Sequence, residues 1–176
     1  MIPNFLSAFR MIAFFPVIIL FSFEYFLTSF FLFSAAAWSD FFDGFLARRY
    51  NITSNLGSLL DLLADKVLVS SVLIFLVFYT GNIYLLILTT ILILREISIS
   101  SLRLFLVSNG VKISNITPDK YGKFKTFLQM FSLSLLLIYP LFGNIFFTSV
   151  LILLLISTFF SLISFLNYLK IWSTLK

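Results

Sequence analysis

Residues 39–65 read SDFFDGFLARRYNITSNLGSLLDLLAD, with four aspartates in the spacing D-x2-D-G-x2-A-R-x8-G-x3-D-x3-D. These are Asp40, Asp43, Asp61 and Asp65, more than half of the seven acidic residues in a chain of 176. The surrounding sequence is almost entirely apolar. A charged aspartate near the centre of a bilayer costs about 2.5–3.5 kcal/mol. Four carboxylates in this setting therefore indicate a function, and the simplest is to bind divalent cations.

The composition is that of an integral membrane protein. Hydrophobic residues make up 61% of the chain and charged residues 11%, whereas a soluble domain has about 45–50% and about 25%. The sequence contains no Cys and no His. This excludes disulfides, thiol nucleophiles, imidazole bases and the usual zinc ligands. Proton transfer has to use carboxylates, Lys, Tyr or Arg.

The apolar segments predict an all-α integral membrane fold with six transmembrane helices, preceded by a short N-terminal interfacial helix over residues 1–10. A spanning helix needs about 20 mostly apolar residues, and polar or glycine-containing breaks separate the segments. The chain is expected to form a single membrane domain, residues 1–176. A Thr-Pro-Asp sequence at 117–119 predicts a capped helical turn before the fifth span. The six spans are expected at residues 11–26, 30–48, 56–79, 83–107, 124–141 and 145–169.

The basic residues predict the orientation. The three loops expected outside contain no Lys or Arg, whereas the segments on the other side are basic. By the positive-inside rule, both termini and the aspartates are cytoplasmic. The net charge of +5 suits an anionic inner leaflet, so the expected partner is the lipid bilayer and no nucleic acid is expected. The basic residues on the inner side include Arg10, Arg48, Arg49, Lys112, Lys120, Lys123, Lys170 and Lys176.

The four aspartates are expected to converge. One pair ends the second span and the other begins the third, and spacings of three and four place each pair on one helix face. Mg2+ prefers such oxygen ligands, and two ions can clamp the attacking and leaving oxygens of a phosphoryl transfer. Three carboxylates would then hold the ions while the fourth acts as a base. Small residues and a cation of the same cleft would admit a diphosphate: Gly44, Ala47, Gly57 and Arg48.

The same carboxylates admit other interpretations. Asp61 and Asp65 lie in an early helix turn, where a carboxylate can cap or stabilise the helix dipole. That explanation fails for Asp40 and Asp43, which lie near a helix C-terminus. A cation transporter also carries intramembrane acids, but its site usually lies near the midplane at a repeat interface, and the sequence has no repeat.

The motif resembles the signature of the CDP-alcohol phosphatidyltransferase family at all eight of its fixed positions. The resemblance implies a six-helix membrane fold, a homodimer, and Mg2+ or Mn2+ as cofactor, with two ions. It implies that Asp40, Asp43 and Asp61 ligate metal, and that Asp65 is the catalytic base and borders the same metal site. It also implies that Gly44, Ala47, Arg48 and Gly57 contact the CDP part of the donor. Direct attack by the acceptor is the family's implied route, and a covalent phosphatidyl-aspartate is the alternative.

Three stretches outside the motif resemble the bacterial phosphatidylglycerophosphate synthase branch of this family: PNFLSAFR at 3–10, REI at 95–97 with LR at 102–103, and GKFKTFLQM at 122–130. Ser7 stands where Thr is expected, which keeps the hydroxyl. The resemblance implies transfer from CDP-diacylglycerol to sn-glycerol 3-phosphate in phospholipid biosynthesis, at the bacterial inner membrane. It adds Asn4 and Ser7 to the CDP-diacylglycerol site. The expected acceptor-binding cations are Arg10, Arg95, Arg103, Lys123 and Lys125.

The sequence identifies the acceptor less specifically than it identifies the family. The Lys residues could serve only as cytoplasmic anchors, and Arg95 could form a salt bridge that packs helices. Within the same family, the acceptor could instead be phosphatidylglycerol, as in a cardiolipin synthase, or serine, as in a phosphatidylserine synthase.

Overall fold

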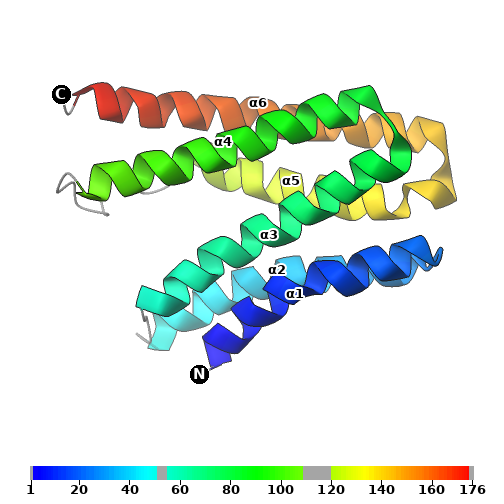
Figure 1. The fold of residues 1–176 in the computed structure, drawn as a ribbon, viewed down its shortest axis with the longest axis horizontal. Helices are drawn as coiled ribbons and strands as arrows, with labels where there is room; N and C mark the ends of the chain where they lie inside the picture. Colours follow the sequence, from blue (N-terminus) through cyan, green and yellow to red (C-terminus); the bar gives the residue numbers. More distant parts are fainter. Residues whose placement is uncertain (1, 51–54, 109–119, 175–176) are drawn as a thin grey trace.

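The computed structural model describes residues 2–50, 55–108 and 120–174 (Figure 1), with the side chains of residues 2–8, 40–50, 55–62, 103, 107, 120–121, 123, 171 and 173–174 outside that description. The described chain is helical and contains no strand, which confirms the predicted all-α class and the count of six main helices. The helices are α1 (Ile2–Ser22), α2 (Phe26–Tyr50), α3 (Asn55–Thr80), α4 (Ile83–Ser108), α5 (Lys120–Phe142) and α6 (Asn144–Thr174).

The helices run up and down between two ends of the molecule. In Figure 1, both termini lie at one end, together with the end of α2 and the start of α3, whereas the α1–α2, α3–α4 and α5–α6 turns lie at the other. Helix α1 packs against α2 and α3, α5 packs against α6, and α3 also contacts α4. Helix α2 also packs against α5, so α2 and α3 together connect the N-terminal helices to α4, α5 and α6.

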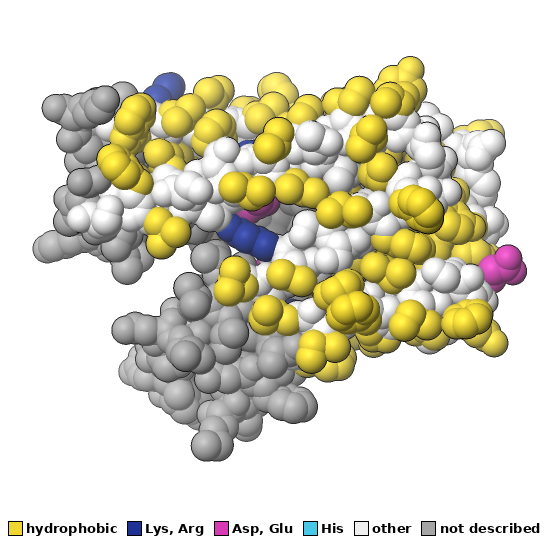
Figure 2. Space-filling view, viewed as in Figure 1, with side chains coloured by type: hydrophobic (Ala, Val, Ile, Leu, Met, Phe, Trp, Pro, Cys, Tyr) yellow, Lys and Arg dark blue, Asp and Glu magenta, His cyan; other side chains and the backbone are white. Residues whose placement is uncertain are grey.

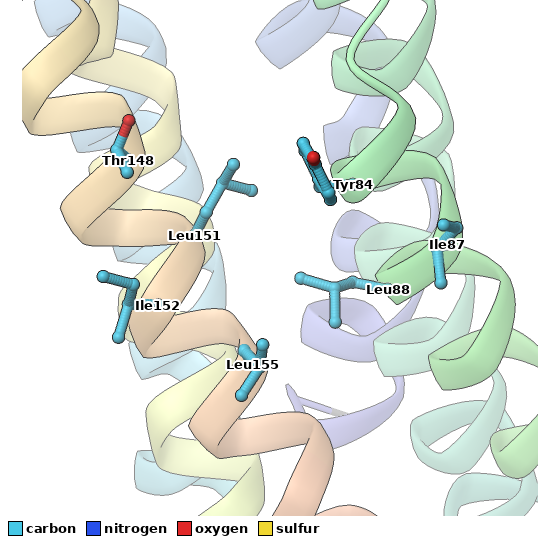
Figure 3. A pocket seen from close by; sticks show the side chains of 7 residues that line it. All are labelled: Tyr84, Ile87, Leu88, Thr148, Leu151, Ile152 and Leu155. Carbon is cyan, nitrogen blue, oxygen red and sulfur yellow. The ribbon is translucent and has the colours of Figure 1, made fainter.

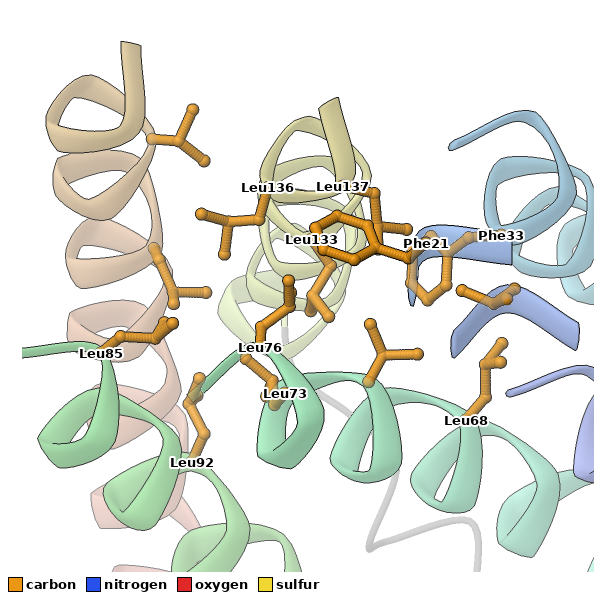
Figure 4. Close-up of a cluster of buried hydrophobic side chains, with 14 of the residues drawn as sticks. Phe21, Phe33, Leu68, Leu73, Leu76, Leu85, Leu92, Leu133, Leu136 and Leu137 are labelled. Carbon is orange, nitrogen blue, oxygen red and sulfur yellow. The ribbon is translucent and has the colours of Figure 1, made fainter. Parts of the chain in front are cut away.

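Among the described residues, the larger of two apolar clusters extends from the middle of the helices to the end that carries the tight turns. Figure 4 shows side chains from different helices meeting there. Burial of these side chains holds α3 against α1 on one side and against α4 and α5 on the other. This packing positions the charged residues near the N-terminal end of α3. The fully buried members include Phe21 of α1, Phe33 of α2, Leu68, Leu73 and Leu76 of α3, Leu85 of α4, and Leu133, Leu136 and Leu137 of α5.

Four helices contain apolar stretches long enough to cross a membrane: Leu63–Thr80, Ile83–Leu106, Phe124–Phe142 and Asn144–Lys170. The searched parts of α1 and α2 contribute the shorter apolar stretches Phe9–Ser22 and Phe26–Ser39. Large hydrophobic side chains also cover much of the face in Figure 2. An exposed apolar surface of this extent is typical of contact with lipid, which supports the predicted membrane location.

The prediction of a separate interfacial helix at residues 1–10 was wrong, because α1 is continuous from Ile2 to Ser22. No proline or glycine lies between residues 4 and 15 to separate the two parts, and Pro3 falls in the first turn, where the missing N–H has no intrahelical partner to lose. The predicted cap at residues 117–119 lies outside the described residues.

The first turn between helices lies at residues 23–25, a few residues before the break expected between the spans 11–26 and 30–48. Glu24 has φ 65°, its N–H donates to the Phe21 carbonyl at 3.0 Å, and the Tyr25 N–H donates to the Leu20 carbonyl at 2.9 Å. This is the Schellman arrangement that ends a helix, and glycine usually occupies its left-handed position. Here a glutamate does, so the sequence carries no glycine signal at this boundary.

The other two tight turns lie where the sequence predicts them. Gly81 and Gly143 have φ 59° and 81°, a region that glycine enters without the cost that a Cβ imposes. Asn82 then caps α4, since its Oδ1 accepts hydrogen bonds from the N–H groups of Tyr84 at 3.0 Å and Leu85 at 3.1 Å.

Candidate active site

The backbone places the aspartate motif at one junction of the fold. Residues 40–50 form the last turns of α2 and residues 55–65 the first turns of α3, as the sequence predicts. Of the four motif aspartates, Asp65 is the one whose side chain the structure describes. The roles of Asp40, Asp43 and Asp61 remain predictions, as do the donor-site roles of Asn4, Ser7, Gly44, Ala47, Arg48 and Gly57, whose side chains lie outside the description.

Asp65 forms an ion pair with Arg10 of α1. The Arg10 Nη1 donates to the Asp65 Oδ1 at 2.6 Å, with the Arg10 side chain 0% and the Asp65 side chain 30% exposed. Arg10 lies three and seven residues before the buried Ala13 and Val17, so it belongs to the face of α1 that packs on α3. A charge-assisted hydrogen bond of this kind orients a carboxylate strongly. We predicted Arg10 among the acceptor cations, and the structure places it against Asp65.

A second group of charges surrounds Glu96 of α4. Its Oε1 accepts hydrogen bonds from the Arg95 Nη1 at 2.8 Å and from the Lys125 Nζ of α5. Arg95 also donates from Nε to the Ser161 carbonyl of α6 at 3.0 Å. The arginine and lysine side chains are 7% and 6% exposed, whereas that of Glu96 is 25% exposed. Both cations are therefore fixed inside the protein, and the carboxylate is the more accessible member.

Helix α3 reaches the same group through Lys66. The Lys66 Nζ donates to the Glu96 carbonyl at 3.4 Å and to the Ser100 hydroxyl. We call Lys66, Arg95, Glu96 and Lys125 the Glu96 cluster. Lys66 is adjacent in sequence to Asp65, so α3 carries the two sites side by side.

The structure thus brings together two of the predicted acceptor cations, Arg95 and Lys125. The alternative for Arg95 was a salt bridge that packs helices, but Arg95 pairs with Glu96 of its own helix. The salt bridge between helices is that of Lys125 with Glu96, which links α5 to α4, and Arg95 reaches α6 through the Ser161 carbonyl. The side chains of Arg103 and Lys123 lie outside the description. Lys66 and Glu96 were not predicted as site residues, although a charged residue inside an apolar span is itself the signal that could have found them.

Among the described residues, no group of three or more acidic side chains forms a metal site; three of the four motif aspartates fall outside them. The donor chemistry nevertheless fits a hard divalent ion. With no His or Cys in the chain, the ionised ligands available are carboxylates, which suit Mg2+ or Mn2+. Helices α2 and α3 contact each other, and the end of α2 and the start of α3, which carry the motif, lie at the same end of the molecule (Figure 1).

A groove between α4 and α6 lies near the opposite end of the molecule. Figure 3 shows its lining, which is apolar except for the Thr148 and Tyr84 hydroxyls. Its lining contains no carboxylate and no cation, so it offers no charged side chain to bind a charged substrate. The full lining is Tyr84, Ile87, Leu88, Thr148, Leu151, Ile152 and Leu155.

The model of the CDP-alcohol phosphatidyltransferase family matches residues 1–168. This chain belongs to that family. The match covers the motif, Arg10, Asp65 and the whole Glu96 cluster, which confirms the resemblance identified from the sequence. The two sites built above are therefore parts of a phosphatidyltransferase fold.

Three relatives of this chain share the name CDP-diacylglycerol–glycerol-3-phosphate 3-phosphatidyltransferase. The protein of Rickettsia bellii is 38% identical over 179 residues, which cover 96% of this chain and 93% of the relative. That of Salmonella typhimurium is 38% identical over 142 residues, 79% of this chain and 78% of the relative. That of Cereibacter sphaeroides is 37% identical over 142 residues, and the alignment spans 77% of this chain but 62% of the longer relative.

Proposed function

We propose that this chain is a phosphatidylglycerophosphate synthase. It would transfer the phosphatidyl group of CDP-diacylglycerol to the primary hydroxyl of sn-glycerol 3-phosphate and release CMP. The observation that carries this proposal is the arrangement on α3, where Asp65 is held by Arg10 while its neighbour Lys66 joins a cluster of cations. A base and an anion site side by side suit an acceptor that carries both a hydroxyl and a phosphate. The names of the relatives support the same substrates.

In this reaction, Asp65 takes the proton of the acceptor hydroxyl. The hydroxyl oxygen forms a bond to the phosphorus of the phosphatidyl group, and the bond from that phosphorus to the CMP oxygen breaks. Arg10 holds the Asp65 carboxylate in one orientation through the 2.6 Å contact, so the base does not have to be ordered as the acceptor binds.

The remaining motif residues would bind the donor. Asp40, Asp43 and Asp61, with Asp65 at the border, would hold Mg2+ or Mn2+, which when bound neutralises diphosphate charge and stabilises the departing CMP. The resemblance assigns the CDP part of the donor to Gly44, Ala47, Arg48 and Gly57, with Asn4 and Ser7.

We place the enzyme in the cytoplasmic membrane of a bacterium, with six spans and with its termini and active site on the cytoplasmic side. The location of both termini at the motif end of the molecule supports this orientation (Figure 1). The distribution of Lys and Arg favours the same orientation by the positive-inside rule. The homodimer is proposed from the family resemblance.

The test is an acceptor panel. Purified protein receives labelled CDP-diacylglycerol and Mg2+ with sn-glycerol 3-phosphate, serine or phosphatidylglycerol, and the lipid product and CMP are measured. We expect turnover with glycerol 3-phosphate alone. Turnover with serine and none with glycerol 3-phosphate would refute the proposed acceptor and leave the family assignment intact.

Variants of the proposed acceptor cations sharpen this test. Arg103→Gln and Lys123→Gln should each raise the KM for glycerol 3-phosphate and leave the KM for CDP-diacylglycerol nearly unchanged, because each loses a charge-assisted hydrogen bond of about 1.5–3 kcal/mol. Lys170→Gln is the matched control, since it removes a cation from the exposed surface of α6. An equal KM change in all three variants would show a general effect of surface charge rather than a binding site.

A further inference from the structure

We propose that Lys66 is a positioning residue, which joins α3 to α4 through the hydroxyl of Ser100 and thereby keeps Asp65 at its place in the active site. Lys66 acts on turnover through the position of α3 and not by contact with substrate. The role of Asp65 as the base rests on the proposed function, whereas the connection between the helices rests on the contacts of Lys66 with α4.

Apolar packing does not join α3 to α4 along their whole length. The two helices meet at a tight turn and diverge toward the end of the molecule that carries the motif (Figure 1). Among the described residues, the larger apolar cluster contains buried side chains of α4 as far as Leu92. The next buried apolar residues of α4, Ile99 and Leu106, cluster instead with Tyr168 of α6. This half of α4 is therefore held to α6, and its connection to α3 has to be polar.

Lys66 supplies such a connection. Its Nζ donates to the Ser100 hydroxyl and to the Glu96 carbonyl at 3.4 Å. The Ser100 hydroxyl donates its own proton to the same carbonyl at 2.7 Å, so its lone pairs are available to the amine. Hydrogen bonds from a charged donor are stronger than those between neutral groups. We call these two contacts of Lys66 with one turn of α4 the Lys66 bridge.

The Lys66 bridge lies where it controls the position of the base. Lys66 directly follows Asp65, and both lie about 20 Å along α3 from the turn that joins it to α4. A tilt of about 3° at that turn would move Asp65 by about 1 Å. Arg10 orients the Asp65 carboxylate, whereas the Lys66 bridge restrains the helix that carries it. Since a displacement of about 1 Å can cost about a hundredfold in rate, loss of the bridge should lower kcat.

A distance measurement tests the bridge without catalysis. The chain has no cysteine, so Leu63→Cys on α3 and Leu104→Cys on α4 provide two sites for spin labels, and both side chains are exposed. Pulsed electron paramagnetic resonance on detergent-purified protein without substrate gives the distance between the labels. We expect a longer or broader distance distribution in Lys66→Met, which keeps an unbranched side chain but removes the donor, and in Ser100→Ala.

Ser98→Ala is the matched control for these variants. Ser98 lies on the same helix as Ser100, but its hydroxyl is exposed and donates within α4 to the Leu94 carbonyl at 2.8 Å. Its removal should leave the distance distribution unchanged. If Lys66→Met does not fold, Ser100→Ala decides, because it removes the acceptor hydroxyl and keeps the charge. A distribution equal to that of the unsubstituted protein in every variant that folds would overturn the proposal.

A double-mutant cycle then connects the bridge to turnover. Lys66→Met should lower kcat about 10–100-fold with both KM values nearly unchanged, and Lys66→Arg should recover part of the loss because it keeps a charged donor. Ser100→Ala should lower kcat less, since the Glu96 carbonyl still accepts from the amine. The double variant should be no slower than Lys66→Met alone, because both changes remove the same contact.

A Lys66 that binds substrate would behave differently. Lys66→Met would then raise a KM, and its effect would multiply with that of Ser100→Ala; either result, or an unchanged kcat in Lys66→Met, would contradict the positioning role. If glycerol 3-phosphate fails as an acceptor, the proposed function is refuted while the distance measurement stands, and kcat is measured with the acceptor that the panel identifies.

Discussion

The ion pair between Arg10 and Asp65 gives the sharpest prediction, because it separates orientation of the base from binding of the acceptor. We expect Arg10→Gln to lose one charge-assisted hydrogen bond, and a fully buried pair that loses one partner is destabilised by about 3–5 kcal/mol. The Asp65 side chain is 30% exposed, so water compensates part of the loss, and about 2–3 kcal/mol is the expected cost. For a chain of this size, that lowers Tm by about 4–12 °C.

The effect on catalysis should fall on kcat. A base displaced by about 1 Å costs about a hundredfold in rate, whereas the acceptor phosphate is bound elsewhere in our proposal, so the acceptor KM should be nearly unchanged. Arg10→Lys should recover part of the lost kcat, since it restores a cation beside Asp65. The measurements are kcat and KM from CMP release, together with thermal unfolding in detergent.

Val17→Ala is the control for lost stability, because Val17 is fully buried on the same face of α1 and does not carry charge. It should lower Tm and leave kcat unchanged. A strongly raised acceptor KM with unchanged kcat in Arg10→Gln would refute the orienting role of Arg10, which would then be the phosphate ligand that the sequence predicts.

Three further predictions concern the metal, the base and a turn. EDTA should abolish CMP release and either Mg2+ or Mn2+ should restore it, because the available ligands are carboxylates; full activity in chelator would contradict the metal site. Asp65→Asn should reduce turnover by about 10²–10⁴-fold, and in a metal titration it should lose less metal affinity than Asp61→Asn does. If both variants lose metal affinity equally, the assignment of Asp65 as base and Asp61 as ligand is wrong. Gly81→Ala should cost about 1–2 kcal/mol, seen as a lower Tm with unchanged kcat, because φ is 59° and no atom lies within 4 Å of the added Cβ; an unchanged Tm would show that the turn relaxes.

The turns show what local sequence can predict in this fold. Gly81 and Gly143 mark two helix boundaries because a left-handed residue without a Cβ is a signal in itself. The α1–α2 boundary was misplaced by a few residues because Glu24 takes the same conformation, and a glutamate gives no such signal. The unbroken start of α1 could not be recognised for a related reason: hydropathy marks the membrane region and does not report whether a helix continues beyond it.

The site shows the same limit at longer range. The motif predicted which helix ends carry the aspartates, since short spacings determine helix faces. It could not predict that Arg10 reaches Asp65, 55 residues away, because that contact depends on how α1 packs on α3. Nor could it show that Glu96 turns toward Lys125 as well as Arg95, since the α5 position is fixed by packing against α6.

Asp65 and Lys66 are consecutive residues, yet one bonds to α1 and the other to α4. Successive residues of a helix point about 100° apart, so the base and the cation cluster lie on adjacent surfaces of α3, the first facing α1 and the second facing α4. A relative with a different acceptor could therefore arise by replacing residues of α4 and α5 alone. The surface of α3 that faces α1 would keep its base unchanged, so the same fold could diversify its products without rebuilding its chemistry.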